Sequence, residues 1–339
     1  MARVALLKGG RSLERQVSLR SGGRVEDALA RLGHDVVALD ADRDLVARLQ
    51  EVAPDACFVA LHGRDGEDGT VQELLEALGL PYTGPGVSAC IRSADKVVAK
   101  HAMRDAGIPT PDFYAFTEAA FQQLGAADAL PAIEERLAFP IVVKPASGGS
   151  ALGIRFARAA ADVPAALVAG FSYDTKVLLE RHVSGRDLAV SILDAQALPI
   201  VEAIPREVTG GPATRAPERE AKPSYDFESR YEIGRTDFVC PAELDAGTTA
   251  RAQDLALRTF ELLGGYGCAR VDLMLDSARG ELFVLEMNAI PGMTETSLLP
   301  QAAEAAGLGF DALVERVLDL ALARGAPAPT TGGGATRRP

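Results

Sequence analysis

The chain has 339 residues, of which 47% are hydrophobic and 24% charged, and its net charge at pH 7 is −12. This length suits a globular protein of about two or three domains, and the acidic balance argues against a general nucleic-acid or membrane surface. No apolar run reaches membrane-spanning length and nothing resembles a secretion signal, so we expect a cytoplasmic protein. The four cysteines lack a paired short spacing, which favours free buried thiols over zinc or disulfides.

The first sixty residues have the pattern of a doubly wound parallel sheet. Short apolar runs alternate with helical patterns, at 3–8, 19–32, 34–40, 43–52 and 56–61. The first βα turn is rich in small residues and carries Glu14, but its spacing does not fit G-x-G-x-x-G. Taken alone, Glu14 is typical of a carboxylate at a helix start.

The third expected strand runs into a glycine-rich, acidic loop within 61–87, and an amphipathic helix follows. Loops at the carboxyl ends of parallel strands bind ligands in such sheets, although this one equally suits a tight solvated connection. Another helix is expected over 93–106, with Ser93 as its cap.

From residue 113 the pattern is that of a mixed domain. A strand over 139–146 carries Lys144 and leads into the glycine-rich segment 147–153. Backbone N–H groups freed by glycine can approach anionic oxygens, so the segment predicts either a flexible flap over phosphates or an ordinary glycine hairpin.

Three further strands are expected at 176–183, 186–193 and 198–205, and Glu180 is unusual within the first of them. The polar stretch 206–236 is either disordered or a lid. Helices at 244–263, 297–306 and 310–324 complete the predicted elements, and the low-complexity tail is expected to be disordered.

Two apolar runs near the C-terminus, 268–276 and 281–289, predict a hairpin that carries three oxygen-bearing side chains, Asp272, Glu286 and Asn288. Glu286 and Asn288 share one face because strand residues alternate sides. Such hard oxygen ligands suit Mg²⁺. The alternative is a solvated edge hairpin on which Arg270 and Asp272 are merely paired.

Seven segments together resemble the D-alanine–D-alanine ligase family of the ATP-grasp superfamily, in the family's order and over about residues 1–325. They are GGRSLERQVSLRSG (9–22), HGRDGEDGTVQELLEALGLPYTG (62–84), SADK (93–96), VVKPASGGSALG (142–153), LLERHVSG (178–185), YDFESRY (225–231) and RVDLML…FVLEMNAIPGMTETSLLP (270–300). The resemblance implies an α/β ATP-grasp fold of three α/β domains: a doubly wound N-terminal domain (1–95), then a central (96–185) and a C-terminal (186–326) domain with mainly antiparallel sheets that clasp ATP. It also makes 206–236 a lid and leaves 327–339 as the tail.

The resemblance also implies residue roles. The ATP site takes Lys96, Lys144, Ser150, Glu180, the backbone of Val183, Asp187 and Arg230. Asp272, Glu286 and Asn288 would bind two Mg²⁺ ions, or Mn²⁺ in their place. Glu14 and His62 would receive the first D-alanine, and Ser297 and Leu298 the carboxylate of the second. Arg270 and the N–H of Gly292 would stabilise an oxyanion, and Tyr231 on the lid would reach Ser150 and Glu14.

The sequence departs from the family pattern at several positions. Arg230 stands where the family has lysine, Ala151 replaces a serine, Asp187 replaces a glutamate and Ala289 replaces a threonine. The lid also carries an insertion of roughly a dozen residues. Because the proposed metal ligands and Arg270 are retained, we expect an active ligase that makes D-alanyl-D-alanine for peptidoglycan precursors.

Two alternatives remain open from the sequence: a related ligase that joins another pair of amino acids, and a nucleotide-binding homologue without catalysis. The expected partners are D-alanine and ATP, with no nucleic acid and no membrane, in a homodimer.

Overall fold

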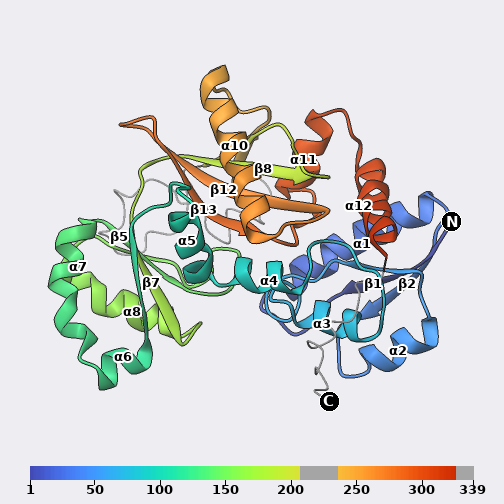
Figure 1. Cartoon of the computed structure of the whole chain (residues 1–339), viewed down its shortest axis with the longest axis horizontal. Coiled ribbons are helices and arrows are strands. Elements are labelled where there is room, and N and C mark those ends of the chain that lie inside the picture. Colours follow the sequence, from blue (N-terminus) through green and yellow to red (C-terminus); the bar gives the residue numbers. More distant parts are fainter. Residues whose placement is uncertain (207–235, 326–339) are drawn as a thin grey trace, which may run out of the picture.

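A computed structural model describes residues 1–206 and 236–325 of the chain. This part folds around three β-sheets, with the first and second at opposite ends of the molecule and helices α4 (Val87–Ala94) and α5 (Lys96–Asp105) between them (Figure 1). The expected lid, with Arg230 and Tyr231, and the expected tail lie outside the described residues, apart from the two ends of the lid segment.

The N-terminal sheet has the predicted parallel arrangement. Its strands are β1 (Arg3–Lys8), β2 (Asp35–Asp40) and β3 (Ala56–Val59), in the order β2-β1-β3. The connecting helices are α1 (Arg15–Arg31) and α2 (Leu45–Val52), and α3 (Thr70–Ala77) follows the glycine-rich loop. The carboxyl end of β1 therefore leads directly to Glu14 at the start of α1.

The central sheet is antiparallel. It contains β4 (Phe113–Thr117), β5 (Ile141–Pro145), β6 (Arg155–Ala157) and β7 (Lys176–Arg181), in the order β4-β7-β5-β6. Its core is shared with α7 (Leu130–Leu137) and α8 (Val163–Phe171), and the short α6 (Glu118–Gln123) follows β4. The sequence analysis predicted β5 and β7 but none of these three helices.

The C-terminal sheet is also antiparallel, with six strands in the order β11-β10-β8-β12-β13 and β9 paired to β8. The strands are β8 (Gly185–Leu193), β9 (Gln196–Ala197), β10 (Val201–Pro205), β11 (Thr236–Val239), β12 (Cys268–Asp276) and β13 (Leu282–Asn288). The last two form the predicted hairpin.

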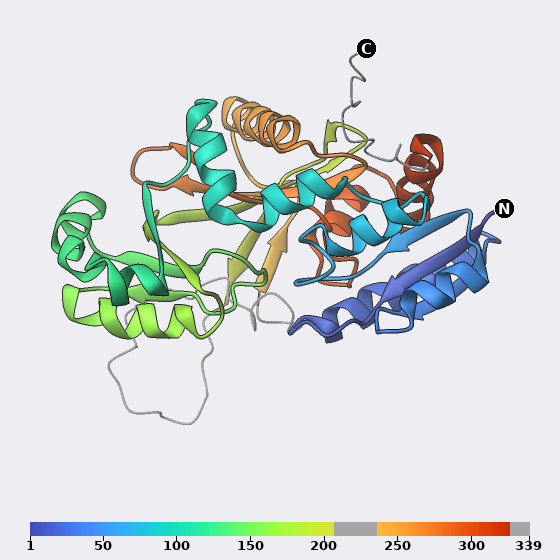
Figure 2. The same ribbon diagram turned by 60° about the horizontal axis from the view of Figure 1, so that its bottom comes forward.

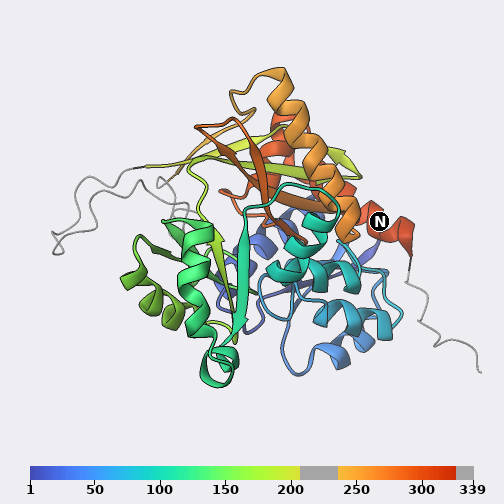
Figure 3. The same ribbon diagram turned by 60° about the vertical axis from the view of Figure 1, so that its left-hand side comes forward.

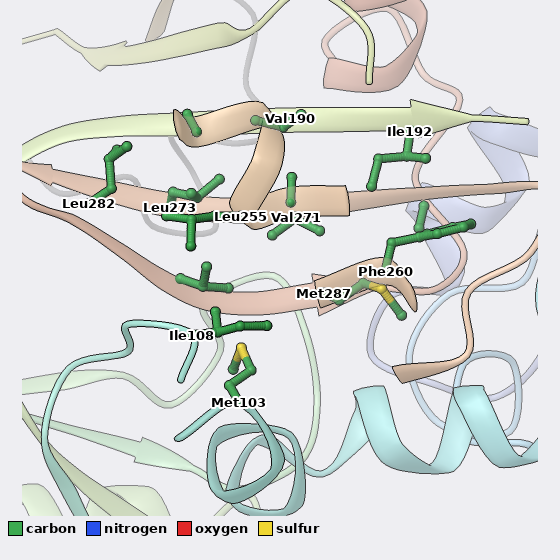
Figure 4. Close-up of a cluster of buried hydrophobic side chains, with 14 of the residues drawn as sticks. Met103, Ile108, Val190, Ile192, Leu255, Phe260, Val271, Leu273, Leu282 and Met287 are labelled. Atoms are coloured by element: carbon green, nitrogen blue, oxygen red, sulfur yellow. The ribbon is translucent and has the colours of Figure 1, made fainter. Parts of the chain in front are cut away.

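One face of this sheet is buried beneath two helices, α5 and α10 (Ala246–Leu263). Figure 4 shows Val271 and Leu273 of β12 packed with Leu255 and Phe260 of α10, and Met103 of α5 joins the same cluster. Side chains alternate along a strand, so Arg270 and Asp272 project to the other face, where α11 (Leu298–Ala305) packs. The hydrophobic pattern of β12 thus directs its polar residues to a single side.

The prediction of one helix over 93–106 with Ser93 as its cap is wrong. The segment contains the end of α4 and the whole of α5, separated at Asp95, whose backbone is extended. Asp95 caps α5 by accepting from the N–H groups of Val97 and Val98 at 2.9 and 3.1 Å. Ser93 lies buried inside α4, where its hydroxyl donates to the carbonyl of Ala89.

The last helix, α12 (Phe310–Arg324), returns to the first sheet, as the red ribbon beside the N-terminal strands shows in Figures 2 and 3. Val314 and Val317 pack with Val4 and Phe58 in one cluster. All four cysteines are free thiols; Cys57, Cys90 and Cys268 are buried, as predicted, whereas Cys240 is half-buried. Within the described ranges, no helix combines the length and apolar character needed to cross a membrane.

Candidate active site

The β12–β13 hairpin brings the four polar residues singled out in the sequence into register. Arg270 lies opposite Asn288 and Asp272 opposite Glu286, and a β-bulge follows immediately after Asp272. Met287 is buried in the core on the opposite face. Directly opposed side chains on one face of a strand pair lie about 5 Å apart at Cβ, so the two carboxylates are neighbours.

Asp272 and Glu286 each have a cationic partner. The Arg270 guanidinium donates to both oxygens of Asp272, at 2.6 and 2.9 Å, and the Asn288 amide donates to Asp272 at 3.1 Å. Nζ of Lys96 lies 3.1 Å from Oε2 of Glu286. The Arg270–Asp272 pair of the alternative interpretation therefore exists, but Asp272 is buried rather than on a solvated face.

This donor set suits a divalent cation only together with a phosphorylated ligand. In the described ranges no cluster of three or more histidine, cysteine or acidic residues could form an all-protein metal site. Mg²⁺ typically binds through one or two carboxylates and completes its shell with phosphate oxygens and water. Asp272, Glu286 and the amide oxygen of Asn288 fit that requirement.

A second charged cluster lies on the central sheet. Lys144 of β5 and Glu180 of β7 are on paired strands, and Nζ of Lys144 donates to Oε1 of Glu180 at 2.6 Å. Nζ of Lys100 lies 2.6 Å from the other oxygen, Oε2. Burial raises the pKa of Glu180, but the charges and hydrogen bonds of the two lysines outweigh burial and lower that pKa below its usual value.

The glycine-rich segment after β5 lies against both the first helix and α5. Nζ of Lys96 donates to the carbonyl of Gly148 at 2.5 Å, and the Lys96 N–H donates to the carbonyl of Ala146. Ser150 has a left-handed φ of 55°, a backbone conformation that L-residues other than glycine rarely adopt. Its hydroxyl donates to the Glu14 carboxylate. The segment is thus a bridge between the first and second sheets.

Glu14 is surrounded by polar groups but shielded from solvent. Burial, and next the negative charge of Glu67, raise the pKa of Glu14 above its usual value. His62 lies nearby, with Nδ1 3.4 Å from Glu67 and Nε2 3.0 Å from the Ser21 hydroxyl. Ser21 in turn accepts from the N–H of Met293, which ties this cluster to the loop after β13.

That loop carries the remaining predicted residues. Ser297 occupies the N-cap position of α11, yet its side chain does not cap the helix; Oγ accepts from the N–H of Thr294 at 2.9 Å. Gly292 lies so close that a Cβ there would be 2.6 Å from the Ser297 hydroxyl. The N–H of Leu298 is one of the first-turn donors that a helix leaves unpaired.

The structure therefore gathers the predicted residues that it describes into one region between the three sheets. Asp187, Asp272, Glu286 and Leu298 line a common pocket. Val183 is buried just beyond β7. Arg230 and Tyr231 lie outside the described residues.

Sequence reasoning missed Lys100 and Glu67 as members of these clusters. Lys100 follows Lys96 by four residues, and in α5 both are buried together with Ala99 and Met103. A lysine that repeats at helical spacing within a buried face is a signal that was available.

The chain is similar in sequence to known proteins over nearly its whole length. Residues 42–85 match the family model described as D-ala D-ala ligase N-terminus, and residues 102–319 match D-ala D-ala ligase C-terminus. A D-alanine--D-alanine ligase of Moorella thermoacetica is 41% identical over 94% of this chain and 99% of its own length. One from Syntrophotalea carbinolica is 42% identical over 93% of this chain and 95% of its own.

A solved structure shows the same fold. The D-alanine--D-alanine ligase of Bacillus anthracis, complexed with ATP, superposes with a TM-score of 0.77 at 29% identity, over 96% of this chain and 98% of the other.

Proposed function

The chain belongs to the D-alanine–D-alanine ligase family, and we propose from that premise that it joins two D-alanines into D-alanyl-D-alanine with ATP and Mg²⁺, for peptidoglycan synthesis. The observation that carries the assignment of roles is the β12–β13 hairpin. It places two carboxylates, an amide and an arginine side by side and next to Lys96, and the two carboxylates line one pocket with Asp187 and Leu298.

ATP is bound between the central and C-terminal sheets. Lys96, Lys144 and the backbone around Ser150 receive the phosphates, since these are the cations and the glycine-rich segment that lie together there. Glu180 accepts from the adenine amino group, with the backbone of Val183 beside the ring, and Asp187 accepts from the ribose hydroxyls. Arg230 is assigned to the phosphates from the family pattern alone.

Asp272, Glu286 and Asn288 are the residues that would hold two Mg²⁺ ions. When bound, these ions neutralise the phosphate charge that otherwise repels an attacking carboxylate. Arg270 and Lys96, which now pair with Asp272 and Glu286, would then be available to the reacting groups.

The first step activates a carboxylate. An oxygen of the first D-alanine attacks the γ-phosphorus, the bond to ADP breaks, and an acyl phosphate forms. Glu14 binds the ammonium of this substrate, since a buried carboxylate beside Ser150 is its natural partner, and His62 lies next to it. Tyr231 takes its role from the family pattern alone: it would reach Ser150 and Glu14, and closure of the lid would keep water from the acyl phosphate.

The second step forms the peptide bond. The amine of the second D-alanine attacks the acyl carbon, phosphate leaves with the former carboxylate oxygen, and the amine loses a proton. Arg270 and the N–H of Gly292 stabilise the tetrahedral oxyanion. Ser297 and the N–H of Leu298 hold the second carboxylate at the start of α11, a favourable place for an anion.

The test is Mg²⁺-dependent ADP release across D-alanine, D-serine, D-lactate and L-amino acids. We expect turnover with D-alanine, and with D-alanine rather than D-lactate as second substrate. Turnover only with another pair would assign a related ligase instead, and ATP binding without turnover would indicate a non-catalytic homologue.

Four further points belong to the same proposal: location, oligomeric state, domain division and lid. We propose a cytoplasmic homodimer, with the three domains divided at residues 95 and 185 and with a lid over 206–236. Light scattering coupled to gel filtration measures the oligomeric state; a monomer at micromolar concentration would refute the dimer.

A further inference from the structure

We propose that Lys100 is a positioning residue that keeps Glu180 ionised and fixed as the acceptor for the adenine amino group, and thereby sets the preference for adenine nucleotides. This inference rests on the proposed function, because that proposal assigns Glu180 to adenine.

The position of Lys100 is unusual for a lysine. Its side chain is fully buried in α5, where an unpaired ammonium group would be strongly unfavourable. Nζ lies 2.6 Å from Oε2 of Glu180, donates to the hydroxyl of Thr110, and lies 5.2 Å from the centre of the Phe113 ring. These contacts come from β7, from the segment after α5 and from β4, so Lys100 is held on several sides.

The two lysines on Glu180 have different access to a ligand. Lys144 bonds Oε1 from the strand that leads into the glycine-rich segment, and it is assigned to the phosphates of ATP. Lys100 has no exposed side-chain surface and lies on the other oxygen. When Lys144 turns to the nucleotide, Lys100 is therefore the cation that stays with the Glu180 carboxylate.

The charge of Glu180 matters because an ionised carboxylate can only accept hydrogen bonds. The adenine amino group donates at the place where hypoxanthine and guanine carry a carbonyl oxygen, so an ionised Glu180 favours ATP and repels ITP or GTP. A protonated Glu180 could donate to that carbonyl and would weaken the discrimination. A buried carboxylate stays ionised only with a nearby cation.

The same cluster predicts a pH dependence. The charged groups that face Lys100 are Glu180 from β7, Lys144 from β5 and Glu286 from β13. Burial lowers the pKa of Lys100 to about 8, although Glu180 opposes that shift. Lys100 therefore loses its positive charge as the pH rises through about 8, and we expect the KM for ATP to rise there while the KM for D-alanine does not follow it.

The experiment compares Lys100→Met, Glu180→Gln and the double variant by steady-state kinetics with ATP and ITP. A lost hydrogen bond to a charged group corresponds to about 10- to 100-fold in affinity. We expect Lys100→Met to raise the KM for ATP by about tenfold and to change kcat by less than about threefold. The ratio of kcat/KM for ATP to kcat/KM for ITP should be smaller than in the wild type. The double variant should match Glu180→Gln, because Lys100 acts through Glu180.

Met103→Ala is the matched control, since Met103 is buried on the same helix but packs in the core of the C-terminal sheet. It should lower the melting temperature and leave the KM for ATP unchanged. The inference would be overturned if the double variant raised the KM for ATP by the product of the two single-variant effects. An unaltered KM for ATP in Lys100→Met would also overturn it. An unaltered KM in Glu180→Gln would instead refute the adenine role of Glu180.

Should Lys100→Met fail to fold, Lys100→Gln takes its place, because glutamine is uncharged and can still donate a hydrogen bond. We expect Lys100→Gln to raise the KM for ATP by about tenfold, and an unaltered KM for ATP would overturn the inference. In the wild-type enzyme, a rise in the KM for ATP at alkaline pH that is absent from Glu180→Gln would support a role of Lys100 through Glu180.

Discussion

Glu286 and Asp272 face each other across the hairpin, and each carboxylate is matched by a cation rather than by solvent. We expect Glu286→Ala to abolish ATP-dependent ligation, since it removes one of two carboxylates available to Mg²⁺, while the circular dichroism spectrum and melting temperature stay close to wild type.

Glu281→Ala is its control, because Glu281 immediately precedes β13 in the same hairpin and its side chain is exposed, with an ion-pair distance of 4.0 Å to Arg279. Near-wild-type turnover in Glu286→Ala would refute the metal assignment.

The ionised carboxylate of Glu14 destabilises the folded protein because it is buried. Its pKa is raised in the folded protein, so its contribution to stability is present below the usual glutamate pKa and is lost as the pH rises through the raised value. We expect Glu14→Gln to raise the melting temperature more at pH 8 than at pH 5, and to raise the KM for the first D-alanine by about 10- to 100-fold.

Thermal unfolding at the two pH values and initial-rate kinetics check both parts of this prediction. A gain in stability that is equal at pH 5 and pH 8 would show that the charge of Glu14 is not the cause.

At this scale the sequence revealed residues whose chemistry contrasts with their neighbours. Asp272, Glu286 and Glu180 stand out because carboxylates are rare in apolar strands. Lys100 did not stand out, because lysine on a helix is normally solvated. Its four-residue spacing from Lys96 indicates that the two lysines share a face of α5, and the structure shows that this face is buried.

At the scale of elements, α5 matters most because it carries both Lys96 and Lys100. Its start depends on Asp95, which accepts from two backbone N–H groups and also pairs with Lys176 at 2.8 Å. Asp95→Ala should lower the free energy of unfolding by about 1 kcal/mol, because two helix-end donors lose their acceptor. It should also raise the KM for ATP.

Asp95→Asn separates the cap from the ion pair, since asparagine caps about as well but carries no charge. Urea unfolding should place it much closer to wild type than Asp95→Ala. Equal destabilisation by both substitutions would show that the pair with Lys176, and not the cap, fixes the start of α5.

The break between α4 and α5 was invisible in the sequence for a physical reason. Serine and aspartate are both good caps, and the apolar pattern continues through the segment. Tertiary packing determines which of the two residues is the cap. Ser93 is buried and hydrogen-bonded within α4, while the carboxylate of Asp95 accepts from the N–H groups of α5. Strands and the hairpin were easier to predict, because short apolar runs bounded by glycine or by a polar turn leave few alternatives.

For the whole molecule, the sequence predicted three sheets in order and a site where they meet. Glu14 comes from the first, Ser150 from the segment after β5 of the second, and Asp272 from the third. It did not predict that α12 returns to the first sheet, since an apolar helix face shows that a helix packs but not against which partner. The return of α12 ties the first and third sheets together around the site.

The central claim is that an alanine carboxylate is activated by phosphoryl transfer before the peptide bond forms. The most direct measurement uses D-alanine labelled with ¹⁸O in its carboxylate, with mass spectrometry of the released phosphate and of the dipeptide. We predict one ¹⁸O in phosphate for each D-alanyl-D-alanine formed. Phosphate without label, or ADP released without dipeptide, would contradict the account.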